Sequence, residues 1–143
     1  MMTSIMTVFR PGNRGDLAAV ETIQYQSSQA AQWNPADYLD YDLWVATSED
    51  VVAGFLVMRR VAPDECEILN LAVATEYRRK HLAQGLFHAA FKQFRGAIFL
   101  EVRESNDAAR KFYKYLGFQE VSVRVSYYTT PPESGIVMKF HSC

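Results

Sequence analysis

Two strand-like segments and the basic turn between them decide the fold: Glu67-Ile-Leu-Asn-Leu-Ala-Val73, Arg78-Arg-Lys-His-Leu-Ala-Gln-Gly85 and Ala97-Ile-Phe-Leu-Glu-Val-Arg103. The first and third segments are rich in apolar residues, which is typical of buried strands. The middle segment opens an amphipathic helix that we expect to end near Phe94. A strand, a helix and a second strand in this order predict a right-handed crossover between two parallel strands.

Two charged features stand out in this region. Glu101 lies in the middle of the second strand, where a charge is costly to bury unless it has a task. The basic run beginning at Arg78 opens a helix, and helix starts bind anions through their free backbone N–H groups. Both features fall at the carboxyl ends of the strands, where ligands of such sheets bind. The residues therefore predict a phosphate-bearing cofactor beside a proton-transfer group. The alternatives are a solvated helix start and an ion pair of Glu101 with Arg103 or Arg124.

Composition excludes several other classes of protein. The chain has 143 residues, of which 49% are hydrophobic and 22% charged, as expected for one globular domain. Its net charge of -1 gives no general drive toward nucleic acid or membrane. We expect neither a signal peptide nor a membrane span, because no apolar run is long enough. Cys66 and Cys143 cannot form a disulfide framework, which favours the cytoplasm. His88 and His141 show no ligand spacing with Cys66, so we expect no metal.

The remaining elements follow from periodicity and turn residues. We expect strands at residues 5–9, 43–46, 51–61, 118–127 and 136–140, and helices at residues 17–27, from Asn34-Pro35 onward, and from a cap at Ser105 to about Leu116. Gly117 stands where a left-handed C-terminal cap belongs. Residues 129–135 are predicted to be a loop.

Three passages carry a resemblance to a known family. They are Glu67-Ile-Leu-Asn-Leu-Ala-Val73 followed by Tyr77-Arg-Arg79, Leu100-Glu-Val-Arg-Glu-Ser-Asn106, and Phe112-Tyr-Lys-Tyr-Leu-Gly-Phe118 followed by Arg124-Val-Ser-Tyr-Tyr128. Together they resemble the GNAT-superfamily N-acetyltransferases, most of all the RimI-type group, which acetylates the N-terminal alanine of a ribosomal protein. The resemblance implies one α/β domain over residues 1–143. Its central sheet would be mostly antiparallel, with one parallel pair splayed around the cofactor and helices on both faces.

The resemblance implies acetyl-CoA as the cofactor. Its pyrophosphate would lie at the helix start, on residues Arg78, Arg79, Lys80, His81, Leu82, Ala83 and Gln84. Its pantetheine arm would meet the backbone of Leu71 and Val73 and the side chain of Asn106, although Asn106 could instead cap the helix. His81 replaces a glycine of the family pattern, and glycine lets a backbone approach a phosphate closely. The imidazole either crowds the phosphate or, when protonated, adds a favourable charge.

Two residues match the catalytic positions of the family. Glu101 would take the proton of the attacking amine, directly or through a water. Tyr113 would protonate or hydrogen-bond the leaving sulfur, and hydrogen bonding is the larger part of its role because a phenol at pKa ~10 does not readily protonate a thiolate at ~8.5. The alternative for Tyr113 is a core tyrosine with a satisfied hydroxyl.

The acceptor side is predicted from aromatic residues. Tyr127, Tyr128 and Trp33 would flank a protein N-terminus, whose α-amine (pKa ~8) loses its proton more easily than lysine (~10.4). Ordinary packing is the alternative for these aromatics. The acidic segment with Asp37, Asp40 and Asp42 would suit a basic peptide, although a solvated surface is the simpler interpretation.

Other functions stay open at this point. The acceptor could be a small amine, or the chain could be a CoA-binding or partner-binding domain without turnover. His81 is the sequence argument for a non-catalytic domain, and Glu101 with Tyr113 argues against it. The sequence does not decide the oligomeric state.

Overall fold

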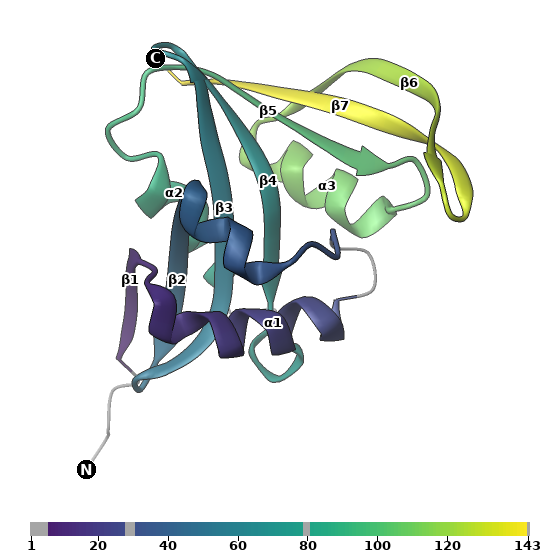
Figure 1. The fold of residues 1–143 in the computed structure, drawn as a ribbon. Coiled ribbons are helices and arrows are strands. Elements are labelled where there is room, and N and C mark those ends of the chain that lie inside the picture. The colour runs from purple at the N-terminus through teal and green to yellow at the C-terminus, as the bar shows by residue number, and fades with distance from the viewer. Residues whose placement is uncertain (1–5, 28–30, 79–80, 143) are drawn as a thin grey trace. The chain divides into compact units, whose positions relative to one another are not determined.

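The computed structural model describes residues 6–27, 31–78 and 81–142 (Figure 1). Their strands are β1 (Thr7–Pro11), β2 (Asp42–Ser48), β3 (Val51–Ala62), β4 (Glu65–Val73), β5 (Gly96–Arg103), β6 (Gln119–Thr129) and β7 (Pro132–Ser142). The α-helices are α1 (Leu17–Gln26), α2 (Leu82–Ala90) and α3 (Asp107–Leu116), and the short 3-10 helices are η1 (Arg14–Asp16), η2 (Pro35–Asp40) and η3 (Thr75–Tyr77). No helix in these ranges is long and apolar enough to cross a membrane.

The strands form one mixed sheet in the order β1-β2-β3-β4-β5-β7-β6. The pairs β1–β2, β2–β3, β5–β7 and β6–β7 are antiparallel. The pair β4–β5 is parallel, and its ladder runs from Glu65 opposite Ala97 to Glu67 opposite Phe99. This arrangement confirms the α/β fold with a mostly antiparallel sheet and one parallel pair.

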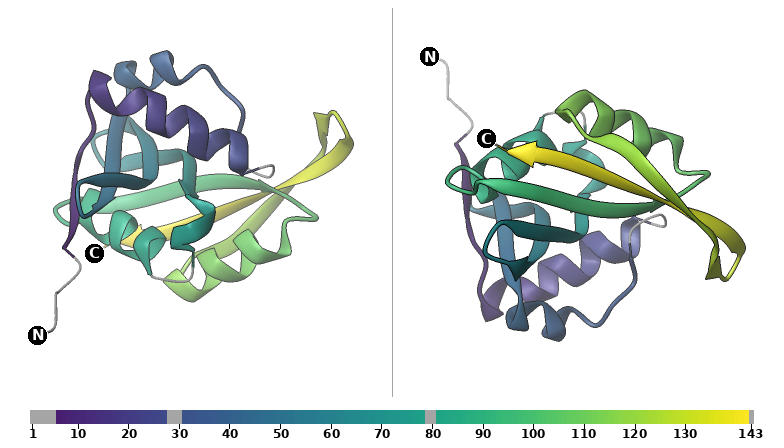
Figure 2. Two further views of the ribbon diagram at one scale, coloured as in Figure 1. Left: turned by 90° about the horizontal axis from the view of Figure 1, so that it is seen from below. Right: turned by 90° about the horizontal axis from the view of Figure 1, so that it is seen from above.

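The chain divides into two compact units. The first lies within Met1–Arg59 and Leu69–Gln93, and it contains α1 and α2 on opposite faces of its strands (Figures 1 and 2). The core on the α1 side consists of Val20, Ile23, Tyr38, Leu43, Val45, Phe55, Val57, Ala72 and Ala74. On the other face, α2 lies so close to β1 that a Cβ on Gly85 would meet the Phe9 ring at 2.2 Å. Helices on both faces of the sheet were expected.

The second unit lies within Arg60–Ile68 and Phe94–Cys143 and contains β5, β7, β6 and α3 (Figure 2). Tyr113 of α3 packs edge to face on Phe118, at 5.3 Å between ring centroids, and Phe118 continues to Phe140 of β7. α3 ends at Gly117, whose φ of 116° is left-handed. Glycine adopts that conformation without steric cost, so the predicted C-cap is confirmed.

Three sequence-based boundaries were wrong. α2 ends at Ala90 rather than near Phe94. Phe94 is nevertheless buried, so the helical spacing of apolar residues continues in the sequence beyond the end of the helix. Asn106, not Ser105, caps α3, because the Asn106 side chain accepts the Ala109 N–H, whereas the backbone N–H of Ser105 binds Glu133 of β7 just before the helix. The predicted loop 129–135 is mostly strand, since β7 already begins at Pro132.

Candidate active site

Glu101 projects from β5 on the face opposite to α3. Along this strand Ile98, Leu100 and Val102 are buried, and Leu100 and Ile98 pair with Met138 and Phe140 of β7 on the α3 side. Successive side chains of a strand alternate between faces. The two predicted catalytic residues, Glu101 and Tyr113, therefore lie on opposite faces of β5.

The Glu101 carboxyl group is mostly buried, with 20% of the side chain exposed. Its Oε2 accepts a hydrogen bond from Arg124 Nη1 at 3.3 Å. Its Oε1 is buried and has no hydrogen-bond partner among the described residues. Burial raises the pKa of Glu101, Arg124 opposes that rise, and Glu67 adds to it. A carboxyl group with a raised pKa is a stronger base than an ordinary glutamate.

A pocket of about 280 Å³ lies beside this carboxyl group within the second unit. Its walls come from the ends of β3 and β4 and from β5, β6 and β7, and they consist of Val61, Glu65, Cys66, Glu67, Phe99, Leu100, Glu101, Arg124 and Val137. Three carboxylates and one guanidinium line the pocket, so it has the polarity that suits a cationic group.

Tyr113 lies in an apolar environment on α3. Only 7% of the residue is exposed, and its ring meets Phe112 and Phe118 edge to face. Burial raises the pKa of its phenol. Among the described residues its hydroxyl forms no hydrogen bond, unlike a core tyrosine with a satisfied hydroxyl. Tyr113 thus stays protonated near neutral pH and can act as a hydrogen-bond donor.

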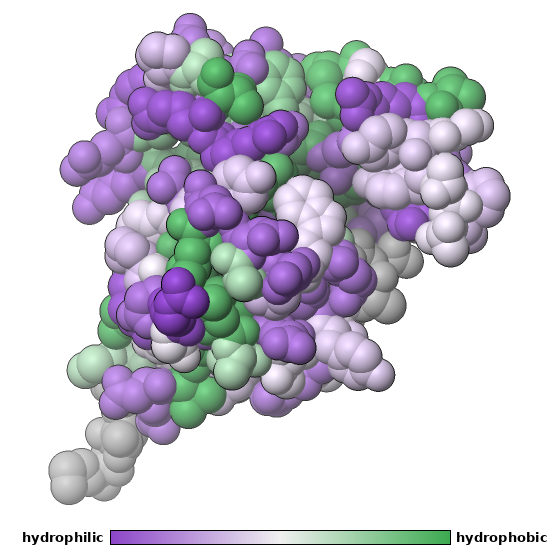
Figure 3. Space-filling model, in the orientation of Figure 1, coloured by the Kyte–Doolittle hydropathy of each residue, from purple (hydrophilic) through white to green (hydrophobic). Residues whose placement is uncertain are grey.

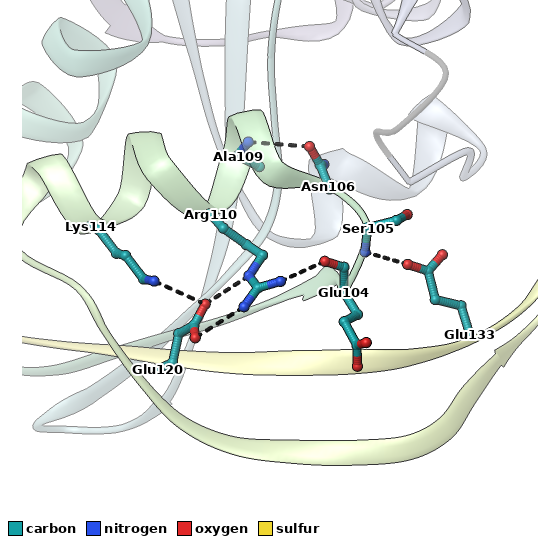
Figure 4. A network of polar contacts seen from close by, with 8 residues as sticks. All are labelled: Glu104, Ser105, Asn106, Ala109, Arg110, Lys114, Glu120 and Glu133. Carbon is teal, nitrogen blue, oxygen red and sulfur yellow. Dashed lines mark hydrogen bonds and ion pairs between the residues drawn. The ribbon is translucent and has the colours of Figure 1, made fainter.

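Asn106 begins α3, as Figure 4 shows. Its Oδ1 accepts the Ala109 N–H at 3.2 Å, which is the capping role that the sequence left open. Within the described part of the chain nothing accepts from the side-chain amide of Asn106, so this group can serve as a donor. The same turn is fixed by Arg110, which donates to the Glu104 carbonyl at 2.7 Å and to Glu120 of β6. The helix start is therefore well defined in position.

Tyr127 and Tyr128, the tyrosines predicted to flank the acceptor peptide, each contact an arginine. The Tyr127 and Tyr128 rings lie edge to face at 5.1 Å, and Tyr127 is 50% exposed. Arg103 lies 4.2 Å from the centre of the Tyr128 ring and donates to the carbonyls of Thr130 and Pro131. Arg103 also pairs with Glu133 at 3.4 Å. Arg103 therefore braces the β6–β7 hairpin, and Arg124 is the arginine that pairs with Glu101.

In the first unit, α2 begins without a side-chain cap. His81 precedes the helix with φ 62° and ψ 19°, a left-handed conformation, and forms no capping hydrogen bond. The N–H groups of Leu82, Ala83 and Gln84 belong to the first turn, where an α-helix offers no internal acceptor. This helix start can hold an anion such as pyrophosphate. Arg79 and Lys80, also predicted to bind it, lie outside the described residues.

Arg78 turns toward the end of β4. Its Nε donates to the Val73 carbonyl at 3.2 Å, and its Nη2 donates to Ser27 Oγ at 3.3 Å. His81, Leu82 and Gln84 also line a pocket of about 390 Å³ together with Thr7 and Phe9 of β1. Three of the predicted phosphate residues thus line a pocket at the helix start, whereas the Arg78 guanidinium is bonded at the end of β4.

A buried polar network was not predicted from the sequence. Asn70 Nδ2 donates to the Ala31 carbonyl at 2.9 Å and to Tyr38 Oη at 3.1 Å, and Tyr38 donates to Gln24. Asn70 Oδ1 accepts the Leu71 N–H at 3.0 Å. The Leu71 N–H, which was predicted to bind the pantetheine arm, therefore already has a partner. The sequence did contain an indication of this network, because Asn70 is a polar residue within an otherwise apolar strand.

Trp33 belongs to the same network through its backbone. Its carbonyl accepts from Gln24 Nε2 at 2.6 Å, whereas the residue is 45% exposed. Asp37, Asp40 and Asp42 are exposed, in keeping with a solvated surface. Figure 3 shows mainly hydrophilic side chains over α1 and η2, with small apolar patches between them. Tyr38 is fully buried and is a core residue.

The groups present suit an anionic cofactor with amide bonds. The helix start offers uncapped N–H groups. The β4–β5 ladder ends at Phe99 while β5 continues to Arg103, so one edge of β5 has no strand partner beyond Phe99 among the described residues. Such an edge hydrogen-bonds extended amide-bearing ligands.

Comparisons with known proteins agree with this geometry. Residues 11–118 match the model of the acetyltransferase (GNAT) family. The [ribosomal protein bS18]-alanine N-acetyltransferase of Escherichia coli K12 is 36% identical over 107 residues, which are 71% of this chain and 70% of that protein.

Two solved structures have the same fold. The crystal structure of the ribosomal-protein-S18-alanine N-acetyltransferase from Escherichia coli superposes with a TM-score of 0.82 at 27% identity, over 96% of both chains. Ard1 from Thermoplasma volcanium gives 0.84 at 26% identity, over 96% of this chain and 98% of that one. The chain therefore belongs to the GNAT family of acetyltransferases, enzymes that take their acetyl group from acetyl-CoA.

Proposed function

We propose that this protein, acting as one domain over residues 1–143, acetylates the N-terminal α-amine of a protein in the cytoplasm. The observation that carries the proposal is the mostly buried Glu101, whose carboxyl group has a raised pKa and lines a pocket rich in carboxylates. A relative at 36% identity is an N-acetyltransferase for an alanine of ribosomal protein bS18, which supports the same class of acceptor.

The chemistry requires a neutral amine and a stabilised leaving group. Glu101 removes the proton of the acceptor ammonium group, so that the nitrogen can attack the acetyl carbonyl. An α-amine at pKa ~8 needs less assistance than a lysine at ~10.4. Tyr113, which burial keeps protonated, donates a hydrogen bond to the departing sulfur. Acetyl-CoA supplies the activated thioester.

Binding of acetyl-CoA is assigned to the groups described above. The N–H groups of Leu82, Ala83 and Gln84 would hold the pyrophosphate at the positive end of the α2 dipole. Val73 and the amide of Asn106 would hydrogen-bond the pantetheine arm. Leu71 would contribute through its carbonyl, because its N–H is bound to Asn70.

The acceptor peptide is assigned to the aromatic residues. Tyr127 and Tyr128 lie on β6 in the unit that carries Glu101, and both rings are held from one side by arginine guanidinium groups. Trp33 is half exposed on the segment that precedes η2. Flat, partly exposed rings of this kind give contact area at low entropic cost.

Acceptor identity is tested with three matched probes and acetyl-CoA at pH 8. The first is a peptide with a free N-terminal alanine and an internal lysine, the second is the same peptide with a blocked N-terminus, and the third is a polyamine. Mass spectrometry with fragmentation should locate the acetyl group on the α-amine of the first peptide and find the other probes unmodified. Glu101→Gln, which keeps the size of the side chain, serves as the control for enzymatic transfer.

Two other outcomes would contradict the proposal. Acetylation of the lysine or the polyamine alone would assign the protein to a different acceptor class. CoA binding by calorimetry with no transfer to any probe would indicate a non-catalytic binding domain.

A further inference from the structure

The Glu101 carboxyl group is held from two sides. On one side Gly135 of β7 lies so close that a Cβ there would be 3.1 Å from Oε1 and 3.2 Å from the carboxyl carbon. On the other side Arg124 Nη1 binds Oε2 at 3.3 Å. Oε1, against Gly135, is buried without a hydrogen-bond partner among the described residues. The carboxyl group therefore depends on Arg124 for its polar contact.

The charged groups that face Glu101 come from two strands, β4 and β6, and Glu65 of β4 lines the same pocket. Glu67 on β4 repels the carboxylate. On β6, Arg124 attracts it, and the neutral phenol of Tyr128 lies within electrostatic reach. The β7 residues at this point, Gly135 and Val137, carry no charge.

Arg103, the other arginine near Glu101, binds different partners. Arg103 follows Glu101 on β5, but its guanidinium pairs with Glu133 at 3.4 Å and donates to two carbonyls of the hairpin. Among the described residues, Arg124 is thus the cation that opposes the desolvation of Glu101 and the repulsion by Glu67.

The position of Arg124 is itself fixed. Its guanidinium carbon lies 4.7 Å from the centre of the Tyr127 ring, within the range of a cation–π contact. The side chain is 56% exposed. An ion pair whose cation is so open to water adds little to stability. Its main effect is therefore local, on the charge and orientation of the carboxyl group.

We propose that Arg124 is a positioning residue that holds the Glu101 carboxylate in its charged form and seats it against Gly135. The inference rests on the proposed function, in which Glu101 is the base that accepts the proton of the amine. A neutral glutamic acid cannot accept that proton. Without Arg124, burial and Glu67 would keep more of the carboxyl group protonated at a given pH.

The first test measures the charge of Glu101 without any turnover. The side-chain carboxyl resonance of ¹³C-labelled glutamate is titrated by NMR in the free full-length protein and is assigned by its absence in Glu101→Gln. Arg124→Gln should move the midpoint upward, by about one pH unit for the loss of a neighbouring opposite charge. Arg124→Lys should restore most of the shift. Arg110→Gln, which breaks the exposed pair with Glu120 in the same unit, should leave the midpoint unchanged.

The second test uses the pH dependence of kcat/KM with the alanine peptide. Both Glu101 and the amine must lose a proton, so log kcat/KM rises with a slope near two below both pKa values and near one between them. In Arg124→Gln the break between these slopes should move to higher pH, which lowers kcat/KM about tenfold on the acid side. The activity on the alkaline side should be retained, and a purely structural loss would instead lower the whole profile.

The two tests separate this inference from the proposed function. If no variant transfers acetyl groups but the Glu101 midpoint still rises in Arg124→Gln, the proposed function fails and the ion pair is nevertheless as described. If transfer occurs and neither the midpoint nor the break moves, Arg124 does not set the charge of Glu101 and the inference is overturned. It is overturned as well if Arg110→Gln moves the midpoint as far as Arg124→Gln does.

Discussion

At the scale of the residue, Glu101 combines a charge with an environment that opposes it. Burial raises the pKa of its carboxyl group above the unfolded value, and the ion pair with Arg124 only partly offsets this effect. A carboxyl group with a raised folded-state pKa favours the folded protein when protonated. Its contribution is present below the unfolded pKa and is lost as the pH rises through the folded pKa. The ionised side chain therefore destabilises the fold at neutral pH, as expected for a residue kept for chemistry.

Glu101→Gln tests this balance. The amide keeps the size of the side chain but carries no charge, so the melting temperature at pH 7 should stay equal or increase. Its difference from wild type should shrink below the unfolded pKa, where both side chains are neutral. Turnover should fall about 10²–10⁴-fold through loss of the base, with acetyl-CoA affinity nearly unchanged. Calorimetric melting and steady-state kinetics measure both effects. A loss of several degrees, with turnover falling in proportion to unfolded protein, would make Glu101 an ion-pair anchor instead.

At the scale of the element, the start of α2 is built around an unusual residue. His81 stands in the left-handed region at φ 62°, where a side chain other than glycine costs about 1–2 kcal/mol. The family pattern has glycine at this position, and the conformation supplies the backbone reason. The sequence showed that a histidine replaces the glycine of the family pattern. Only the φ angle of His81 shows that the lost property is the ability of glycine to adopt a left-handed conformation without strain.

His81→Gly and His81→Ala separate the backbone from the imidazole. Both variants remove the ring, but only glycine relieves the left-handed strain. CoA binding in calorimetry should be equal or tighter in His81→Gly than in wild type. His81→Ala should melt at a lower temperature than His81→Gly, because alanine retains the strain and glycine loses it. If both variants weaken CoA binding several-fold, and more strongly below pH 6, the protonated imidazole is a phosphate ligand.

Some elements could be predicted from the sequence and others could not, for identifiable reasons. The cap at Gly117 was readable, since it follows from local backbone geometry. The cap of α3 was wrongly assigned to Ser105, because Ser105 and Asn106 are adjacent and either residue type can cap a helix; the structure shows Asn106 accepting the Ala109 N–H. The sequence also left open whether Arg103 or Arg124 pairs with Glu101. In the structure Arg124 of β6 pairs with Glu101 and Arg103 pairs with Glu133 of β7, and nothing local in the sequence indicates these contacts between strands.

At the scale of the whole molecule, the parallel pair was predictable, because a strand, a helix and a second strand in succession form a right-handed crossover between parallel strands, whereas the order of the seven strands was not predicted. For the site, the sequence named candidate residues but not their geometry. Alternation along β5 places Glu101 and Tyr113 on opposite faces of the strand. The buried contacts of Asn70 with Tyr38 and Ala31 join segments that are far apart in sequence. Such contacts depend on the folded core and not on local pattern.

The distribution of charge gives a last prediction, about how acceptors are attracted. The exposed carboxylates Asp37, Asp40 and Asp42 lie on or beside η2, and the chain as a whole has a net charge of -1. Exposed charges are screened over about 8 Å at physiological salt, so this segment should add little to acceptor binding. Replacing the three aspartates by asparagine should change kcat/KM by less than about threefold at 0.15 M salt, for a lysine-bearing and for a neutral alanine peptide alike. A matched variant with glutamine at the exposed Glu21, Glu49 and Glu76 alters the net charge equally and serves as the control. If the aspartate variant alone loses more than tenfold on the lysine-bearing peptide, and the loss disappears at high salt, the acidic segment contacts the acceptor and sets a preference for basic N-termini.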